Sequence, residues 1–265
     1  ALVDILLKES EEFLARSGAQ RGGMVLVDSH HIENLLLSCN ARPAMVPGGS
    51  ACNTILGVGK LGNPARFIGK CGDDRLGKLF AEGLVRHNVE GMLFHSPSPT
   101  GRVLSIITPD AQRSMLTFLG ASSEAGAHEL TPACFDQAAI VHIEGYLLFN
   151  HDLIRAALHM AREHGAKVSL DCASFTVVEQ NRSILDELIR DYVDILIANE
   201  DEARALTGLD DEDAALQNLA KMAPIAVLKL GKRGAMIARE GTVTRVGIMG
   251  DGCALDTTGA GDLWA

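Results

Sequence analysis

The sequence predicts an α/β fold with a mostly parallel central sheet. From Ala139 onward, short apolar segments of strand character alternate with segments of helical periodicity. Such an alternation implies right-handed βαβ units, whose parallel strands are covered by helices on both faces. Composition agrees, because hydrophobic residues are 47% and charged residues 22% of the 265 residues, as in ordinary globular proteins. The active site of such a sheet is expected beyond the carboxyl ends of its strands.

The elements of this half follow in order. The predicted strands are residues 139–143, 167–170, 193–198 and 225–230. The predicted helices are residues 152–164, 184–191, 200–206 and 211–222.

The region from about residue 92 to 119 departs from this pattern. Residues 103–108 and 114–118 have strand character and are joined by a turn at 109–112, with no helix between them. This arrangement is typical of a β-hairpin. The alternative is an antiparallel extension of the main sheet.

Charge and apolar patterning exclude several classes of protein. The net charge of -10 and the lack of a basic tract argue against a nucleic-acid partner. No apolar run is long enough to span a bilayer, and the N-terminal residues lack the basic region, apolar block and cleavage site that are expected of a signal peptide. The cysteines show no metal-binding spacing and indicate reduced thiols in a cytoplasmic protein. They are Cys39, Cys52, Cys71, Cys134, Cys172 and Cys253.

One glycine-rich segment matches a dinucleotide fingerprint by spacing alone. Residues 57–62 read G-x-G-x-x-G, but they follow a helical segment and precede Pro64. The fingerprint needs a strand before it and a helix after it. The segment is therefore interpreted as the end of a helix.

The last ten residues carry the strongest functional signal. Gly259, Ala260 and Gly261 permit a tight turn before an apolar stretch that begins like a helix. The free amides and the dipole of such a start form a cradle for an anion, typically phosphate. Asp262 lies beside the cradle, where it can take a proton from an attacking hydroxyl, as phosphoryl transfer requires. The alternative is a glycine-rich turn whose Asp caps a helix.

Polar residues near the N-terminus suit a polyol. Asp4 is an acid inside an apolar run, so it must be paired or must face a ligand. Gly48 and Gly49 allow a ligand to approach the backbone closely. Asn53, about one helical turn later, offers both a donor and an acceptor to vicinal hydroxyls.

Two stretches resemble one known family. Residues 256–262 match completely the C-terminal signature of the ribokinase-like (PfkB) carbohydrate and nucleoside kinases, and residues 48–54 and 66–77 resemble the N-terminal signature. The resemblance implies a three-layer α/β/α kinase domain over 1–265, with both ends incomplete. It also implies a small β-sheet lid from segments near 24–40 and 92–119, including those around Val25 and Leu37, which is the dimer contact in many members.

The resemblance also assigns residues. Asp4 corresponds to an Asp that binds substrate hydroxyls. Asn199 and Glu202 match the Asn-x-x-Glu motif that organises magnesium, largely through water, although a helix N-cap explains the same letters. Lys229 and Gly231 belong to a loop that resembles the nucleotide-contacting loop. Thr257, within the C-terminal signature, is expected to contact ATP, and its neighbours lie near the family's monovalent-cation site.

Two further residues are expected to meet the substrate. Arg113, in the lid hairpin, is expected to reach a transferred phosphate, or else to be a solvated turn arginine. Glu144, after the strand ending at Ile143, is positioned to bond the hydroxyls of a free sugar.

These observations predict an ATP-dependent, magnesium-requiring kinase that phosphorylates a primary hydroxyl of a sugar or nucleoside. The opening of the chain looks closest to adenosine-kinase-like members, so adenosine kinase is the specific alternative. A potassium requirement, a homodimer through the lid sheet and a cytoplasmic location are further expectations. A non-catalytic sugar- or nucleotide-binding regulator is the rival from another class, but such a binder has no need of Asp262 as a base.

Overall fold

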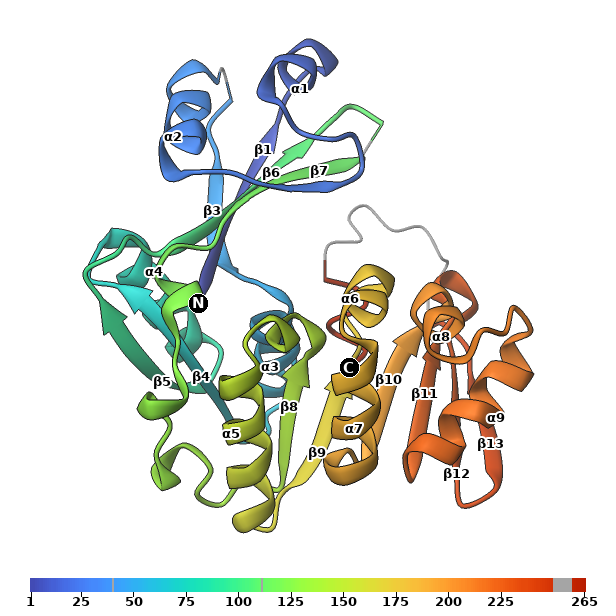
Figure 1. Cartoon of the computed structure of the whole chain (residues 1–265). Helices are drawn as coiled ribbons and strands as arrows, with labels where there is room; N and C mark the ends of the chain where they lie inside the picture. The colour runs from blue at the N-terminus through green and yellow to red at the C-terminus, as the bar shows by residue number, and fades with distance from the viewer. Residues whose placement is uncertain (40, 111, 250–258) are drawn as a thin grey trace. The chain divides into compact units, whose positions relative to one another are not determined.

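The computed structural model describes all residues except 40, 111 and 250–258, which Figure 1 draws in grey. By its internal contacts the chain divides into two compact units. The first comprises Ala1–Ala125, and the second comprises residues 126–249 and 259–265. Among the described residues, the first unit contains two sheets and the second contains one.

Five strands form the larger sheet of the first unit, in the order β2-β7-β6-β1-β3. They are β1 (Leu2–Lys8), β2 (Met24–Leu26), β3 (Ala44–Gly48), β6 (Gly101–Ile107) and β7 (Arg113–Phe118). The predicted hairpin is confirmed, because β6 and β7 pair antiparallel. Helices α1 (Glu11–Ser17) and α2 (Ser29–Ser38) lie beside this sheet (Figure 1).

Three expectations about the lid are corrected. Leu37 lies in α2 rather than in a strand, because Asp28 starts a helix by accepting a hydrogen bond of 2.8 Å from the His31 amide. The segment from residue 92 begins within β5 (Val89–Ser96), which pairs with β4 (Ala65–Gly72) in a separate two-stranded parallel sheet. The alternative, in which the hairpin extends the sheet of parallel strands from residue 139 onward, is also wrong. Strand β6 pairs with β1, and both belong to the five-stranded sheet of the first unit.

Asp4, the one acid of β1, does not face the hydrophobic core. Side chains alternate between the faces of a strand. Val3, Ile5 and Leu7 are buried in the core with residues of α1 and α2. Asp4 therefore lies on the opposite face, and it is 7% exposed.

The two-stranded sheet of the first unit is packed by α3 (Ser50–Lys60) and α4 (Arg75–Arg86). The interpretation of residues 57–62 is confirmed, because α3 runs through Gly57 and Gly59. A Cβ on Gly59 would lie 2.2 Å from the His87 carbonyl oxygen, so this glycine serves close packing.

Six strands form the sheet of the second unit, in the order β13-β12-β11-β10-β9-β8. The parallel strands are β8 (Ile140–Glu144), β9 (Lys167–Asp171), β10 (Ile195–Asn199) and β11 (Ile225–Lys229). The antiparallel strands β12 (Ala235–Arg239) and β13 (Thr242–Val246) complete the sheet.

Helices cover the strands of the second unit (Figure 1). They are α5 (His151–Glu163), α6 (Phe175–Gln180), α7 (Arg182–Tyr192), α8 (Glu200–Thr207) and α9 (Glu212–Met222). All predicted strands and helices of this half are confirmed, with small shifts at their ends. Helix α6 was not predicted.

Two expectations about the class of protein can be compared with the described residues. Of the helices that the structure describes, none combines the length and apolarity of a bilayer-spanning segment. The five described cysteines carry free thiols. Cys253 lies outside the described residues.

Candidate active site

The four parallel strands of the second unit all end on a polar residue. Glu144 ends β8, Asp171 ends β9, Asn199 ends β10 and Lys229 ends β11. The pairing register sets Glu144 opposite Asp171, and Asn199 opposite Lys229. Because the strands are parallel, all four side chains lie at one edge of the sheet, where α/β proteins bind ligands.

A buried ion pair joins two of these strand ends. Lys229 Nζ donates to Asp171 Oδ2, and the two side chains are 14% and 4% exposed. Burial alone would lower the pKa of Lys229, but the Asp171 carboxylate and the acids beyond it raise that pKa above its ordinary value. Lys229 is therefore held as a charged ammonium group, with Asp171 as its counterion, at the edge of the sheet.

The glycine-rich turn lies next to this charge. A Cβ on Gly261 would be 3.8 Å from Lys229 Nζ. Gly259 has a φ of +71°, and the Leu263 amide donates to its carbonyl at 2.8 Å. Residues 259–264 form a turn, and the amides of Ala260 and Gly261 precede this hydrogen bond, as the first amides of a helix do.

Asn199 and Glu202 form a capping box at the start of α8. Asn199 Oδ1 accepts from the Glu202 amide at 2.9 Å, and Glu202 Oε2 accepts from the Asn199 amide at 2.8 Å. Asn199 Nδ2 also donates to Glu202 Oε1 at 2.8 Å. The structure thus bears out the N-cap alternative for these letters.

Glu202 of the capping box has a raised pKa. Glu202 is 2% exposed. Burial raises its pKa to about 7, and the neighbouring Asp171 and Glu144 carboxylates act in the same direction. We name Glu144, Asp171, Glu202 and Lys229 the carboxyl-edge cluster.

The carboxyl-edge cluster fits a divalent cation held through water. It contains three carboxylates and one ammonium group, so positive charge is favoured there. Among the described residues, no group of three His, Cys, Asp or Glu side chains is close enough to coordinate a metal directly. Magnesium keeps several of its waters, so a sparse site of this kind is suitable for it.

Glu144 and Asp262 belong to the same electrostatic site. Burial raises the pKa of Glu144, and Asp171 and Asp262 raise it further. Asp262 therefore lies within the electrostatic range of the carboxyl-edge cluster.

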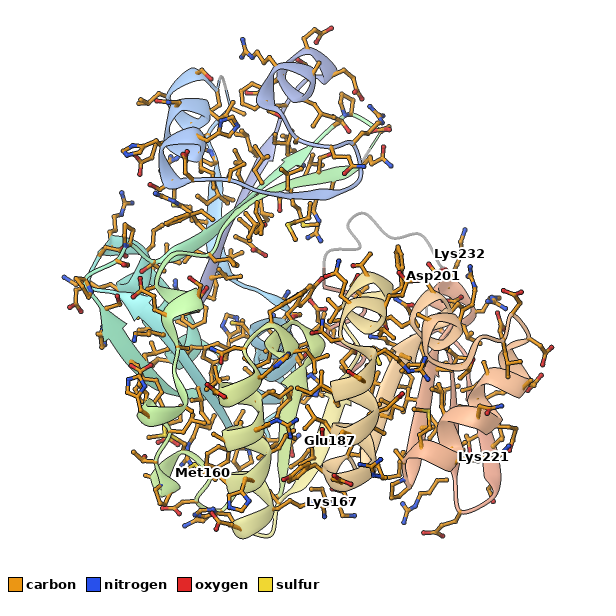
Figure 2. All side chains as sticks on the ribbon, viewed as in Figure 1. Met160, Lys167, Glu187, Asp201, Lys221 and Lys232 are labelled. Carbon is orange, nitrogen blue, oxygen red and sulfur yellow. The ribbon has the colours of Figure 1, made fainter. Side chains whose placement is uncertain are left out.

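The loop after β11 is shaped by its glycines. Gly231 has a φ of +54° and Gly234 a φ of +88°, and the Leu230 amide donates to the Gly234 carbonyl at 2.8 Å. Arg233 in this loop forms ion pairs with Glu200 and Glu212, at the starts of α8 and α9. Figure 2 shows Lys232 and Asp201 at the same end of this unit, and both residues are exposed.

The predicted site residues of the first unit form their own group. A Cβ on Gly48 would lie 2.2 Å from Asp4 Cγ, so the absent side chain leaves room for the carboxyl group. Gly49, with a φ of +87°, precedes α3, and the Asn53 amide donates to its carbonyl at 2.9 Å. Burial raises the pKa of Cys52 to about 12, and Asp4 contributes to that shift. Asp4, the two glycines and the start of α3 are thus adjacent.

Two predicted site residues remain, Arg113 and Thr257. Arg113 is the first residue of β7, opposite Ile107 in the hairpin. Thr257 lies outside the described residues.

Sequence reasoning missed Asp171. The signal was present, because an acid directly follows a short apolar strand that is flanked by helices. What the sequence does not show is that the strand order brings it to Lys229.

Comparison with known proteins gives consistent results. The model of the pfkB family carbohydrate kinases matches residues 28–265. Fructokinase-1 of Zea mays is 29% identical over 82% of this chain and 71% of its own length. The adenosine kinase of Sinorhizobium meliloti has a TM-score of 0.88 and 34% identity, over 99% of this chain and 82% of that one. A probable sugar kinase of Rhizobium etli has a TM-score of 0.89 and 31% identity, over 99% and 81%. The expected ribokinase-like fold is confirmed.

Proposed function

Because the chain belongs to the pfkB family of carbohydrate kinases and is a sugar or nucleoside kinase, we propose that it transfers the γ-phosphoryl group of ATP to a primary hydroxyl. One observation carries the proposal. Lys229, held by Asp171, lies beside Gly261 in the turn that leads into Asp262. The Lys229 ammonium group, the glycine turn and the Asp262 carboxylate, which is the proposed base, thus follow one another.

Each group has one task in the proposed reaction. Asp262 takes the proton of the attacking hydroxyl. The amides of Gly259, Ala260 and Gly261 stabilise the charge that develops on the transferred phosphoryl group. Lys229 adds positive charge at the same place, and Asp171 keeps its ammonium group oriented.

We propose that Asn199 and Glu202 hold magnesium through its water ligands. When bound, magnesium neutralises the phosphate oxygens of ATP. Gly231 is proposed to let the nucleotide approach the loop after β11, since space beside it is open: a Cβ there would meet no heavy atom within 4 Å. Thr257 as an ATP contact and Arg113 as a phosphate contact stay predictions.

For the acceptor, a sugar or nucleoside, we propose that Asp4 and Asn53 of the first unit bond its hydroxyls, with Gly48 and Gly49 allowing close approach. Glu144, in the second unit, stays a predicted ligand of acceptor hydroxyls. Adenosine is the specific alternative. Three exposed aromatic side chains favour it: Tyr146 and Phe149, in a short turn after β8, and Phe175, the first residue of α6. That turn contacts α6, so the rings offer a surface for a base.

Release of ADP tests the function directly. The purified protein with magnesium and ATP is offered adenosine, D-ribose and D-fructose in turn. We expect rapid turnover with one class of acceptor and slow turnover with the other. Turnover with none of them, together with tight binding of one, would favour the regulator instead.

Three expectations about partners and location remain predictions. They are the homodimer through the lid sheet, the potassium requirement and the cytoplasmic location. Exposed Met24 and Leu26 on β2 support the first, because β2 is an edge strand of the five-stranded sheet. Sedimentation of the protein and of Leu26→Lys, and turnover with potassium replaced by sodium, test the first two.

A further inference from the structure

One hydrogen-bonded cluster of the first unit has no task in the proposed reaction. It joins Asp74, the N-cap of α4, to Thr100, the last residue before β6. Asp74 Oδ1 accepts from the Thr100 hydroxyl at 2.7 Å, and Asp74 Oδ2 accepts from the Thr100 amide at 2.8 Å. The carboxylate therefore holds Thr100 by its side chain and by its backbone.

The same cluster includes the end of β4. The Gly72 amide donates to the Thr100 hydroxyl at 2.9 Å, and the Gly77 amide of α4 donates to Asp74 Oδ1 at 2.8 Å. Thr100 is fully buried, so loss of its hydroxyl would remove this acceptor from the Gly72 amide away from water. We name Asp74, Thr100 and the amides of Gly72 and Gly77 the β6 anchor. It fastens the end of β4, the start of α4 and the start of β6 at one point.

The hydrogen-bond donors of the β6 anchor favour the charged form of Asp74. Burial would raise the pKa of Asp74, but the hydrogen bonds from Thr100 and Gly77 lower it below its ordinary value. Hydrogen bonds to a charged group are stronger than those between neutral groups. We therefore expect the β6 anchor to resist displacement of Thr100.

The β6 anchor adjoins the first row of the five-stranded sheet. Gly101 follows Thr100 and pairs with Leu2 of β1, which pairs in turn with Gly48 of β3. A Cβ on Gly101 would lie 2.5 Å from Leu2 Cδ2 and 2.3 Å from the Leu119 carbonyl oxygen. Because the strands have no spare room in this row, a displacement of Thr100 must also move β1.

Asp4 lies in the next row on the same face of the sheet. It is opposite Val103 of β6 and Val46 of β3. Val103 is only three residues beyond Thr100, or about 10 Å along an extended strand. The position of the Asp4 carboxylate therefore depends on the register and placement of β6, which the β6 anchor fixes at its start.

We propose that Asp74 and Thr100 are positioning residues for the acceptor. They fix the start of β6 against α4 and β4, and the pairing of β6 with β1 then holds the Asp4 carboxylate where it meets the acceptor's hydroxyl groups. This rests on the proposed function in one respect, that Asp4 bonds the acceptor. Asp74 and Thr100 act through the two strands rather than by contact with the acceptor.

Backbone NMR without any substrate tests the β6 anchor alone. Thr100→Val removes the hydroxyl at nearly constant size, and Thr100→Ser restores it. The matched control is Thr108→Val beyond the far end of β6, where a buried hydroxyl also donates to an Asp side chain, that of Asp110, at 2.6 Å. The amide signals of Asp4 and Val103 should move in Thr100→Val and stay in place in Thr100→Ser and Thr108→Val. Unchanged signals in Thr100→Val, or equal changes in Thr108→Val, would overturn the proposal.

Hydrogen exchange of the unmutated protein gives a measurement that needs no variant. The amides of Gly72, Gly77 and Thr100 should exchange as slowly as the paired amides of β1 and β6, since all of them are protected by hydrogen bonds. Rapid exchange of the Gly72 and Thr100 amides would overturn the proposal even where Thr100→Val fails to fold.

Kinetics then tests the link to the acceptor. With adenosine and with D-fructose as probes, Thr100→Val should raise the acceptor KM roughly 2- to 30-fold and leave the KM of ATP unchanged, with rescue by Thr100→Ser. An unchanged acceptor KM, or equal rises for acceptor and ATP, would overturn the link. Failure of the unmutated protein to phosphorylate any acceptor would contradict the proposed function, whereas the NMR and exchange results would still decide the role of the β6 anchor.

Discussion

The two units place their acidic groups in different ways. In the first, Asp4 lies inside β1, and the missing side chain of Gly48 makes room for its carboxyl group. In the second, Glu144 and Asp171 lie at the ends of adjacent parallel strands, and pairing register brings them together. The first site depends on the space that a glycine leaves, and the second depends on the order of the strands in the sheet. The first site should therefore be disturbed most by adding a small side chain, and the second by removing a charged group.

The largest expected effect is a fall in turnover when Asp262 of the second unit is replaced. Asp262→Asn removes the proposed base but keeps its size, so turnover should fall roughly 10²- to 10⁴-fold with ATP and acceptor still bound. ADP release and calorimetric titration measure the two quantities. Asp201→Asn, an exposed change on α8, is the control and should leave turnover unaltered. Near-normal turnover in Asp262→Asn would exclude Asp262 as the base.

The next effect concerns the buried ion pair. Asp171→Asn leaves the Lys229 ammonium buried without its counterion and should cost about 3–5 kcal/mol of the free energy of unfolding. The double variant with Lys229→Met should cost clearly less than the sum of the single changes. Urea unfolding of the unmutated protein, the two single variants and the double variant gives the coupling free energy between Asp171 and Lys229.

An exposed pair provides the matched control for that cycle. Arg155 and Glu187 also form an ion pair, but both side chains are well exposed, and Figure 2 marks Glu187 on α7. Glu187→Gln should change stability little. Equal losses in Asp171→Asn and Glu187→Gln would contradict the structural role of the buried pair.

Glu202 makes the second unit sensitive to pH. Its pKa is about 7 in the folded chain against an ordinary value of 4.5. Between these values the folded chain keeps a proton that the unfolded chain has released, so the free energy of unfolding falls as pH rises. The fall from this group should be roughly 3 kcal/mol between pH 4.5 and 7.

Urea unfolding at intervals from pH 4.5 to 7.5 measures that dependence. Glu202→Gln retains a side chain suited to the capping box but has no proton to release. Its unfolding free energy should depend less on pH than that of the unmutated protein. Parallel curves for the two proteins would assign the pH dependence to other groups.

The smallest effect is the steric test of the first unit. The Cβ of Gly48→Ala would lie 2.2 Å from Asp4 Cγ and must displace the carboxyl group. We expect a loss of roughly 1–3 kcal/mol in the free energy of unfolding, as for other overpacked sites. Acceptor binding should weaken more than ATP binding, as measured by calorimetry. Gly247→Ala, where a Cβ meets no heavy atom within 4 Å, is the control; equal losses of acceptor and ATP binding would assign Asp4 to the scaffold.

Local patterns predicted most of the second unit and part of the candidate site. Alternating apolar and amphipathic segments identify strands and helices, because burial follows the same periods. Asp4 was identifiable because it interrupts an apolar strand, and Asp262 because it follows glycines. Asp171 was missed because its importance depends on Lys229, 58 residues later. Leu37 was misplaced because the helix start at Asp28 is a local signal that the resemblance obscured.

The polar strand ends of the second unit all lie at one edge of its sheet, so insertions at the opposite edge should not disturb the candidate site. There, Gly165 and Gly241 turn the chain before β9 and after β12, and a Cβ on either would meet no heavy atom within 4 Å. Lys167, just beyond the first turn, lies at the far end of the unit from Lys232 (Figure 2). A peptide tag or a fluorescent reporter inserted at either turn should therefore be accepted without loss of turnover.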